Sequence, residues 1–208
     1  NGYKPRNPEV NFHGQKRGNA THVSTTDPEA RLYKKADGQP AKLYHMGHAI
    51  TENRHGLVMA VAVSEANGQA EPAAAVEMID HLRRRQRIRA KTAGSDKGYD
   101  SGPYYHELEK RDVIPHSAMR AGPVGGVCRR SRKHLPLIQL RKRMARRLRT
   151  RGYQLSQRCR KKIEEAFGWI KTVAGMCRTR LVGRWKIKQQ LQLAAAAYNL
   201  VRIRKLAT

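Results

Sequence analysis

Acidic side chains are almost missing from the last 88 residues, where 24 positions are Lys or Arg and only Glu164 and Glu165 are acidic. Residues 121–208 therefore carry a net charge of +22, whereas residues 1–120 carry only +5. Such self-repulsion destabilises a compact fold, so an ordinary globular enzyme has no use for it. Nucleic acid is the favoured partner, because phosphates release counterions when Lys and Arg neutralise them. An anionic membrane surface is less favoured, because the basic residues do not follow one amphipathic helix.

Cysteine is also scarce, since Cys128, Cys159 and Cys177 lie far apart and form no Cys-x-x-Cys motif. This pattern argues against a disulfide framework and fits a reducing compartment. The nine histidines and three cysteines show no zinc-finger spacing, which leaves a zinc module as a weak alternative. The sequence has no apolar run of 18 residues, so no membrane span is predicted. With two Phe, two Trp and eight Tyr, base stacking on single strands is disfavoured and contact with duplex DNA is favoured.

The length of 208 residues predicts one domain with a substantial core. Residues 1–30 are rich in Asn, Gly, Pro and Thr and are predicted to be a polar loop segment, with the folded core in residues 31–208. Within that core, residues 121–152 hold 11 Lys or Arg and are predicted to be a basic insertion or arm, helical from about 136 to 149.

Apolar periodicity predicts the remaining elements. A Val-rich run at 57–64 follows the turn residues 51–56, which predicts a hairpin with 42–50. Further strands are predicted at 88–95 and 113–116, and helices at 71–85, 103–111, 155–173 and 186–204. The last helix is apolar on several sides and is predicted to lie in the core. The order hairpin, helix, strand, helix, strand predicts a mixed α/β sheet.

Two aspartates border the loop after the strand at 88–95. Asp96 ends that strand and opens a Gly-containing loop, where α/β proteins often expose a functional side chain. The alternative is a turn aspartate that accepts a hydrogen bond from its own backbone, and the sequence does not decide between the two. Asp100 is predicted to be a helix cap, a role that Ser101 could also fill.

The helix at 155–173 carries the two isolated glutamates. Its predicted buried stripe is Cys159, Ile163, Ala166, Phe167 and Ile170. Beside that stripe, Arg160, Glu164 and Lys171 share about one quadrant of the helix surface. This pattern fits a metal ligand between phosphate-binding cations, although an ordinary ion pair explains it equally well. Glu165 shares its face with Lys161, Lys162 and Trp169, so an ion pair is the preferred prediction there.

Phosphodiester chemistry links the two acids. In-line attack at phosphorus requires an activated oxygen nucleophile and a stabilised leaving oxygen, and a pair of divalent cations serves both. Because Mg²⁺ prefers oxygen ligands, Asp96 and Glu164 could supply two of the carboxylates. A third carboxylate is normally needed, and spacing alone does not identify it.

Several linked segments resemble the DDE transposases of bacterial insertion sequences. In particular, they resemble the group with a tyrosine-arginine-glutamate-lysine signature around the third acid. The resemblance runs from about residue 7 to residue 206 and rests on motifs in the expected order. These are STTDPEARLYKK (24–35), GHAITENRHGLVMAVAVSEANGQAE (47–71), GSDKGYDS (94–101), SQRCRKKIEEAFGWIKTVAG (156–175) and LAAAAYNLVRIRKL (193–206).

The resemblance implies an RNase H-like core that cleaves and joins DNA ends with Mg²⁺ or Mn²⁺. The second catalytic aspartate falls on Asp96 and the catalytic glutamate on Glu164, and both are expected to bind the metal. The signature arginine and lysine fall on Arg160 and Lys171. The expected partner is duplex DNA at transposon ends and targets, and the expected location is the nucleoid in bacterial cytoplasm. The side chains expected to contact DNA are Arg160, Lys171, Arg158 and Lys161.

The sequence departs from the family pattern in two places. Gln157 occupies the position of the signature tyrosine, and no strand with the first catalytic aspartate precedes residue 24. We do not assign that role to Asp27. The chain is therefore expected to correspond to the C-terminal half to two-thirds of a transposase. It should be inactive alone, and should act as a homo-oligomer or with a complementing N-terminal chain. The alternative function is a non-catalytic basic nucleic-acid-binding protein.

Overall fold

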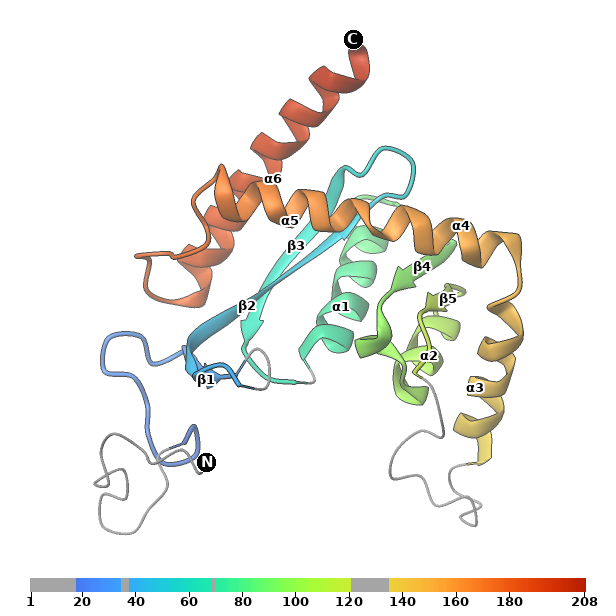
Figure 1. Cartoon of the computed structure of the whole chain (residues 1–208), viewed down its shortest axis with the longest axis horizontal. Coiled ribbons are helices and arrows are strands. Elements are labelled where there is room, and N and C mark those ends of the chain that lie inside the picture. The colour runs from blue at the N-terminus through green and yellow to red at the C-terminus, as the bar shows by residue number, and fades with distance from the viewer. Residues whose placement is uncertain (1–17, 35–37, 69, 121–134) are drawn as a thin grey trace.

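The computed structural model describes residues 18–34, 38–68, 70–120 and 135–208, and these form a mixed α/β fold (Figure 1). The strands are β1 (Arg31–Tyr33), β2 (Lys42–Thr51), β3 (Val58–Glu65), β4 (Thr92–Ser95) and β5 (Ile114–Ser117). The helices are α1 (Ala70–Arg85), the short 3-10 helix η3 (Lys97–Tyr99), α2 (Gly102–Glu109), α3 (Leu135–Arg147), α4 (Arg151–Arg160), α5 (Lys162–Thr172) and α6 (Arg184–Ala207).

The strands form two separate sheets. The predicted hairpin is confirmed, because β2 pairs antiparallel with β3 in a register that places His48 opposite Ala62. The short strand β1 adds to the other edge of β2, and β4 pairs in parallel with β5. The prediction of one mixed sheet was wrong: within the described residues no ladder joins β2 to β4. Along the stretch where β2 and β4 face each other, each has a partner on one side only among the strands that the structure describes.

Helix α1 begins and ends close to the predicted residues. Its inner face repeats apolar residues at helical spacing, and Ala74, Ala75, Met78, Ile79 and Leu82 are buried. Glu71 lies in its first turn and Arg83, Arg84 and Arg85 in its last, so the charges oppose the helix dipole at both ends. The helix packs against β2 and β3 as well as α2, so it spans the space between the two sheets (Figure 1).

The buried side chains fall into two clusters. One cluster contains Tyr105 and Leu108 of α2 together with Leu140 and Met144 of α3. The other contains Ala166 and Ile170 of α5 and the inner face of α6. Each sheet therefore has its own core, and α1 and β2 lie between them.

The C-terminal helices differ from the prediction in detail. The single helix expected at 155–173 is divided at Lys161 into α4 and α5, which follow almost one line (Figure 1). Helix α6 buries Ile187, Leu191 and Tyr198, but its last turns project from the fold (Figure 1). Leu200 is 70% exposed, so the predicted core position holds only as far as about Tyr198.

Asp100 is not the helix cap that the sequence suggested. The Ser101 hydroxyl accepts the capping hydrogen bond from the Tyr104 amide, because its backbone is extended at the start of α2. The Asp100 carboxylate instead turns inward, where its side chain is 1% exposed and pairs with Arg141 of α3 at 2.9 Å. Burial opposes ionisation, yet hydrogen bonds from Arg141, the Arg120 amide and Tyr105 hold the pKa of Asp100 below its ordinary value.

We predict that Asp100→Ala destabilises the protein by about 3–5 kcal/mol, because it leaves a guanidinium in a buried site without its carboxylate. Glu109→Ala is the matched control, because it breaks the more exposed ion pair between Glu109 of α2 and Arg143 of α3. Breaking this pair should cost less than about 1 kcal/mol. Urea unfolding at pH 7 measures both. Equal losses would show that the Asp100 pair does not anchor α3.

Candidate functional site

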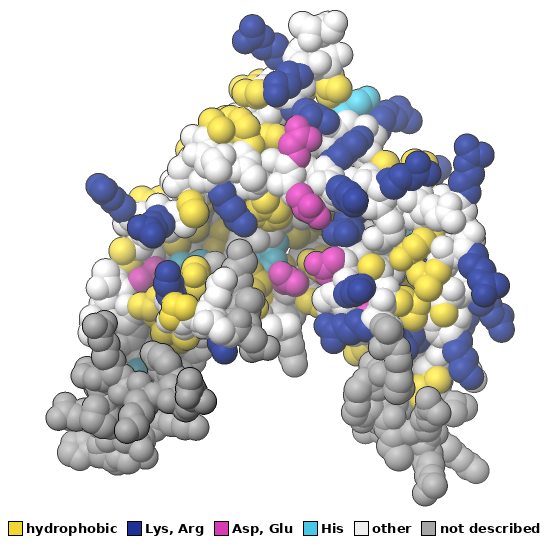
Figure 2. Space-filling model, viewed as in Figure 1, with side chains coloured by type: hydrophobic (Ala, Val, Ile, Leu, Met, Phe, Trp, Pro, Cys, Tyr) yellow, Lys and Arg dark blue, Asp and Glu magenta, His cyan; other side chains and the backbone are white. Residues whose placement is uncertain are grey.

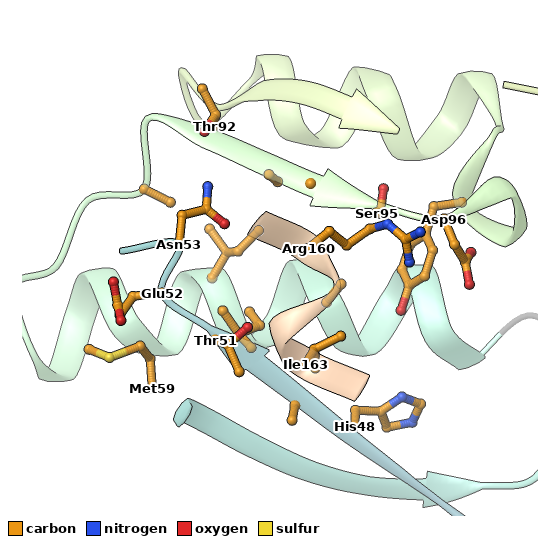
Figure 3. Close-up of a pocket in the computed structure, with 18 of the residues that line it drawn as sticks. His48, Thr51, Glu52, Asn53, Met59, Thr92, Ser95, Asp96, Arg160 and Ile163 are labelled. Atoms are coloured by element: carbon orange, nitrogen blue, oxygen red, sulfur yellow. The ribbon is translucent and has the colours of Figure 1, made fainter. Parts of the chain in front are cut away.

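A cavity of about 520 Å³ lies between β2 and β4 (Figure 3). Its two long walls are residues 47–53 of β2 and the following turn, and residues 90–96 of β4 and its flanks. Helix α1 supplies apolar side chains on one side, and Ile163 and Phe167 of α5 supply them on the other. Asp96, Arg160 and Glu164 all line this cavity, so the two predicted acids border one space although they come from distant parts of the chain.

Asp96 directly follows β4 and is the N-cap of η3. Its Oδ1 atom accepts a hydrogen bond from the Gly98 amide at 2.7 Å, which is the turn contact considered from sequence. This contact orients the carboxylate and uses only one oxygen. The side chain is exposed at the mouth of the cavity, and no described residue donates a hydrogen bond to Oδ2.

Glu71 is the acid that the sequence analysis missed. A Cβ atom on Gly98 would lie 3.0 Å from Asp96 Oδ1 and 3.5 Å from Glu71 Oε2, so both carboxylates border the same loop. Partial burial and the charge of Asp96 raise the pKa of Glu71. Two carboxylates that repel each other form a place where a cation is stabilising. Nothing in the sequence indicated that Glu71 lies near Asp96. A carboxylate in the first turn of a helix is already explained by its favourable interaction with the helix dipole.

Glu164 lies in the first turn of α5. Its side chain is 68% exposed and its Oε1 atom is 3.8 Å from Nη1 of Arg160. An ion pair of that length and exposure contributes little to stability, so it does not commit Glu164 to a structural role. Glu164 is more exposed than the predicted position at the border of the core, because Ile163 and Phe167 of the expected stripe line a cavity and are only half-buried.

Arg160 reaches from the end of α4 toward the end of β4 that carries Asp96 (Figure 3). Its Nε atom donates to Gln157 Oε1 at 3.2 Å. The Gln157 amide in turn donates to the carbonyl oxygens of Ser95 and His116, at the ends of β4 and β5. Gln157 therefore fastens α4 to both strands and fixes where Arg160 points.

The other cations proposed for DNA contact lie outside the cavity. Arg158 and Lys161 are exposed at the junction of α4 and α5. Lys171 lies over the ring of Phe167, 5.7 Å from its centroid. Figure 2 shows acidic side chains gathered along the middle of one face, with Lys and Arg on either side of them. The ion pair predicted for Glu165 is confirmed, although its partner is Arg202 of α6, at 2.7 Å.

The carboxylates around the cavity suit a divalent cation in their chemistry but not in their placement. Asp96, Glu71 and Glu164 offer the carboxylate oxygens that Mg²⁺ prefers. No group of three His, Cys, Asp or Glu side chains in the described part of the chain is placed to hold one ion. Sequence reasoning therefore identified two acids that border one cavity, but it did not identify a complete set of metal ligands.

Comparison with known families gives one match. A model of the family described as "Transposase DDE domain" matches residues 19–200, from the segment that precedes β1 into the second half of α6. The chain has no significant match among curated proteins or among solved structures. Of the helices within the described residues, none has the length and apolar character needed to span a bilayer.

His48 gives a pH prediction for this region. It is 5% exposed on β2 and contacts the Ser64 hydroxyl at 2.7 Å. Burial lowers its pKa to about 4, whereas the unfolded chain has the ordinary value of about 6.5. The unfolded state therefore takes up the proton first as pH falls. Stability from neutral His48 is complete above about pH 6.5 and declines toward pH 4, by at most about 3 kcal/mol.

His48→Gln should flatten this decline, because glutamine can contact Ser64 without titrating. The measurement is the free energy of unfolding in urea at pH 7 and pH 5, for wild type and for the variant. His22→Gln is the control, since it makes the same substitution at an exposed position away from the cavity. An unchanged pH dependence in His48→Gln would contradict the burial of a neutral imidazole.

Proposed function

Because the chain belongs to the DDE transposase family, we propose that it binds DNA and contributes Asp96 and Glu164 to metal-dependent cleavage and strand transfer at the ends of an insertion sequence. The observation that supports this most is the shared cavity. One acid ends a strand and the other begins a helix, yet both border one space with Arg160 between their elements. The cavity is also flanked by the basic surface of α4 and α5 (Figure 2).

In this proposal each side chain has a separate task. Asp96 and Glu164 hold Mg²⁺ or Mn²⁺, which when bound activates the attacking oxygen and stabilises the leaving one. The Gly98 amide keeps Asp96 Oδ1 in place and leaves Oδ2 for the ion. Arg160, fixed by Gln157, binds the phosphate that reacts. Glu71 adds negative charge beside Asp96 and strengthens the attraction for a cation.

The DNA partner follows from the charge distribution. Arg158 and Lys161 project from the α4–α5 junction on the outer side of the site, and Lys171 lies farther along α5. Contacts of this type go to phosphates and carry no sequence information by themselves. We propose that they hold duplex DNA across the cavity so that one phosphodiester reaches Asp96 and Glu164.

The proposed enzyme is incomplete without a further carboxylate. A two-metal site of this type needs more oxygen ligands than Asp96 and Glu164 provide. We propose that another chain, either a second copy or a complementing N-terminal polypeptide, supplies the missing acid to an RNase H-like core. Alone, the 208 residues should bind metal weakly and cleave DNA barely. The setting is the nucleoid of a bacterial cell.

A non-catalytic DNA-binding protein is the second candidate. It is favoured by the finding that the described residues form no group of three metal ligands. The two candidates differ in one respect: a binder is indifferent to Mn²⁺ and to Glu164, whereas a transposase requires both.

The first prediction from this proposal concerns cleavage. With Mn²⁺ and the complementing N-terminal polypeptide, Asp96→Ala and Glu164→Ala should each reduce nicking of a labelled DNA end by at least about 100-fold, since each removes a metal ligand. Glu165→Ala is the control, because Glu165 is adjacent in sequence but pairs with Arg202. Equal activity in wild type, Asp96→Ala and Glu164→Ala would remove both acids from the chemistry and leave the DNA-binding alternative.

The second prediction concerns salt. Arg158→Ala and Lys161→Ala should each lower the slope of log K against log salt by about 0.9, because each loses one phosphate contact. Lys110→Ala should change neither slope nor affinity, since Lys110 pairs with Glu107 in α2. The slope is measured by fluorescence anisotropy with a duplex oligonucleotide at salt concentrations from about 50 to 200 mM, where phosphate contacts change the affinity strongly. Identical slopes in all three variants would exclude the α4–α5 junction as the DNA contact.

A further inference from the structure

A second hollow, of about 560 Å³, lies between the loop 173–183 and the first turns of α6. It shares no lining residue with the cavity that Asp96 borders. The loop follows the end of α5 that is opposite to the α4–α5 junction (Figure 1). Because the 11 residues of α5 extend about 16 Å, this hollow is a separate surface at the other end of that helix.

The hollow contains an exposed tryptophan. Of the two tryptophans in the chain, Trp169 packs against Tyr198 in the core, with ring centroids 5.9 Å apart. Trp185, in contrast, is 63% exposed, and it lines the hollow together with the exposed side chains of Leu181 and Leu193. A single exposed apolar residue is common on protein surfaces, but three grouped around one hollow indicate a binding surface.

The charged residues of the hollow are all cations. Arg178, Arg180 and Lys186 line it, and none of its lining residues is acidic. Lys186 lies over the ring of Trp185, 5.9 Å from the centroid. The neighbouring Arg184 is neutralised by Glu29 at 2.7 Å. A polyanion is therefore the favoured ligand, whereas a second copy of a chain with a net charge of +27 would be repelled.

Amide side chains lie beside the indole ring. The Thr179 hydroxyl donates to Gln190 Oε1 at 3.0 Å and accepts from the Leu181 amide at 3.1 Å, so the loop is fastened to α6. Gln189 also lines the hollow. Amide groups of this kind bind the edges of bases, and an aromatic ring stacks on their faces. In a duplex the edges are paired and the faces are covered by neighbouring bases, so only an unpaired base can use both contacts.

We propose that this surface, which we call the α5–α6 hollow, binds an unpaired nucleotide of single-stranded DNA, with the base stacked on Trp185 and the adjoining phosphates bound by Arg178 and Arg180. Stacking on one aromatic ring contributes about 1–3 kcal/mol and accepts any base. The scarcity of aromatic residues disfavours single strands over the chain as a whole, and the hollow is a local exception. The inference rests on the proposed function only for the choice of DNA, since the contacts fit any single strand.

The first test measures the fluorescence of Trp185 in the absence of divalent metal. In the variant Trp169→Phe, Trp185 is the sole tryptophan, and a single-stranded oligonucleotide of about 16 nucleotides should quench its emission saturably. A blunt duplex of the same strand length should leave the emission largely unchanged, because its bases stay stacked on one another. Equal quenching by the two ligands, or quenching by neither, would overturn the proposal.

Fluorescence anisotropy with a labelled single strand gives a second readout, which does not need the Trp169 substitution. Trp185→Ala should weaken binding at least about fivefold, whereas Trp185→Phe keeps a ring and should keep most of the affinity. Leu200→Ala is the matched control, because it removes a 70% exposed apolar side chain of the same helix outside the hollow. An equal loss in Leu200→Ala, or no loss in Trp185→Ala, would contradict stacking on Trp185.

The salt dependence of single-strand binding tests the phosphate contacts. Arg178→Ala and Arg180→Ala should each lower the slope of log K against log salt by about 0.7, since each loses one phosphate of a single strand. Lys188→Ala should leave the slope unchanged, because Lys188 is exposed on α6 but does not line the hollow. Unchanged slopes in both arginine variants would overturn the placement of the phosphates.

Two comparisons separate this inference from the proposed catalysis. Asp96→Ala should bind the single strand as the wild type does, because Asp96 does not line the α5–α6 hollow. Loss of single-strand binding in Asp96→Ala would contradict a separate hollow, whereas intact binding without any nicking would count against the catalytic proposal alone. An RNA strand that binds at least about tenfold more tightly than the DNA strand would overturn DNA as the occupant.

Discussion

The arrangement depends on how α4 is held against the ends of β4 and β5. The Gln157 side chain donates to the carbonyl oxygens of Ser95 and His116, one in each strand, so a single amide joins the helix to both. The two strands are themselves tied by their ladder and by the 2.6 Å contact between the hydroxyls of Ser95 and Ser117. Because Asp96 follows Ser95 directly and Arg160 is one turn beyond Gln157, this junction sets the relation between the strand-end acid and the helix that carries Glu164.

Charge is distributed around this junction in a way that a simple DNA-binding surface does not need. The C-terminal 88 residues keep two carboxylates among 24 cations, and the structure gives these carboxylates different surroundings. Glu165 forms a 2.7 Å pair with Arg202 between two helices, which explains its presence structurally. Glu164 has only a 3.8 Å contact with Arg160 and borders the cavity with Asp96. The carboxylate without a strong structural partner is the one that our proposal uses.

The sequence predicted local features well and long-range ones poorly. Val-rich and turn residues identified the hairpin of β2 and β3, and spacing identified α1, because both signals are local in the chain. Asp96 was found because a Gly-containing loop follows its strand. Glu71 was missed because its proximity to Asp96 arises only when α1 packs across the fold. Asp100 was assigned to a cap because its partner Arg141 lies 41 positions away in sequence. The single sheet was wrong because strand patterns do not show whether two edges meet.

The most direct test of the central claim is an anomalous difference map from crystals of the protein grown with Mn²⁺, a DNA end and the complementing N-terminal polypeptide. If the proposal is right, we expect a peak with carboxylate oxygens of Asp96 and Glu164 both within roughly 2.5 Å of Mn²⁺, in the same site or in an adjoining pair. The account would be contradicted by a peak that contacts neither acid. It would also be contradicted if the two carboxylates stay too far apart to bind the same Mn²⁺ or two adjoining Mn²⁺ ions.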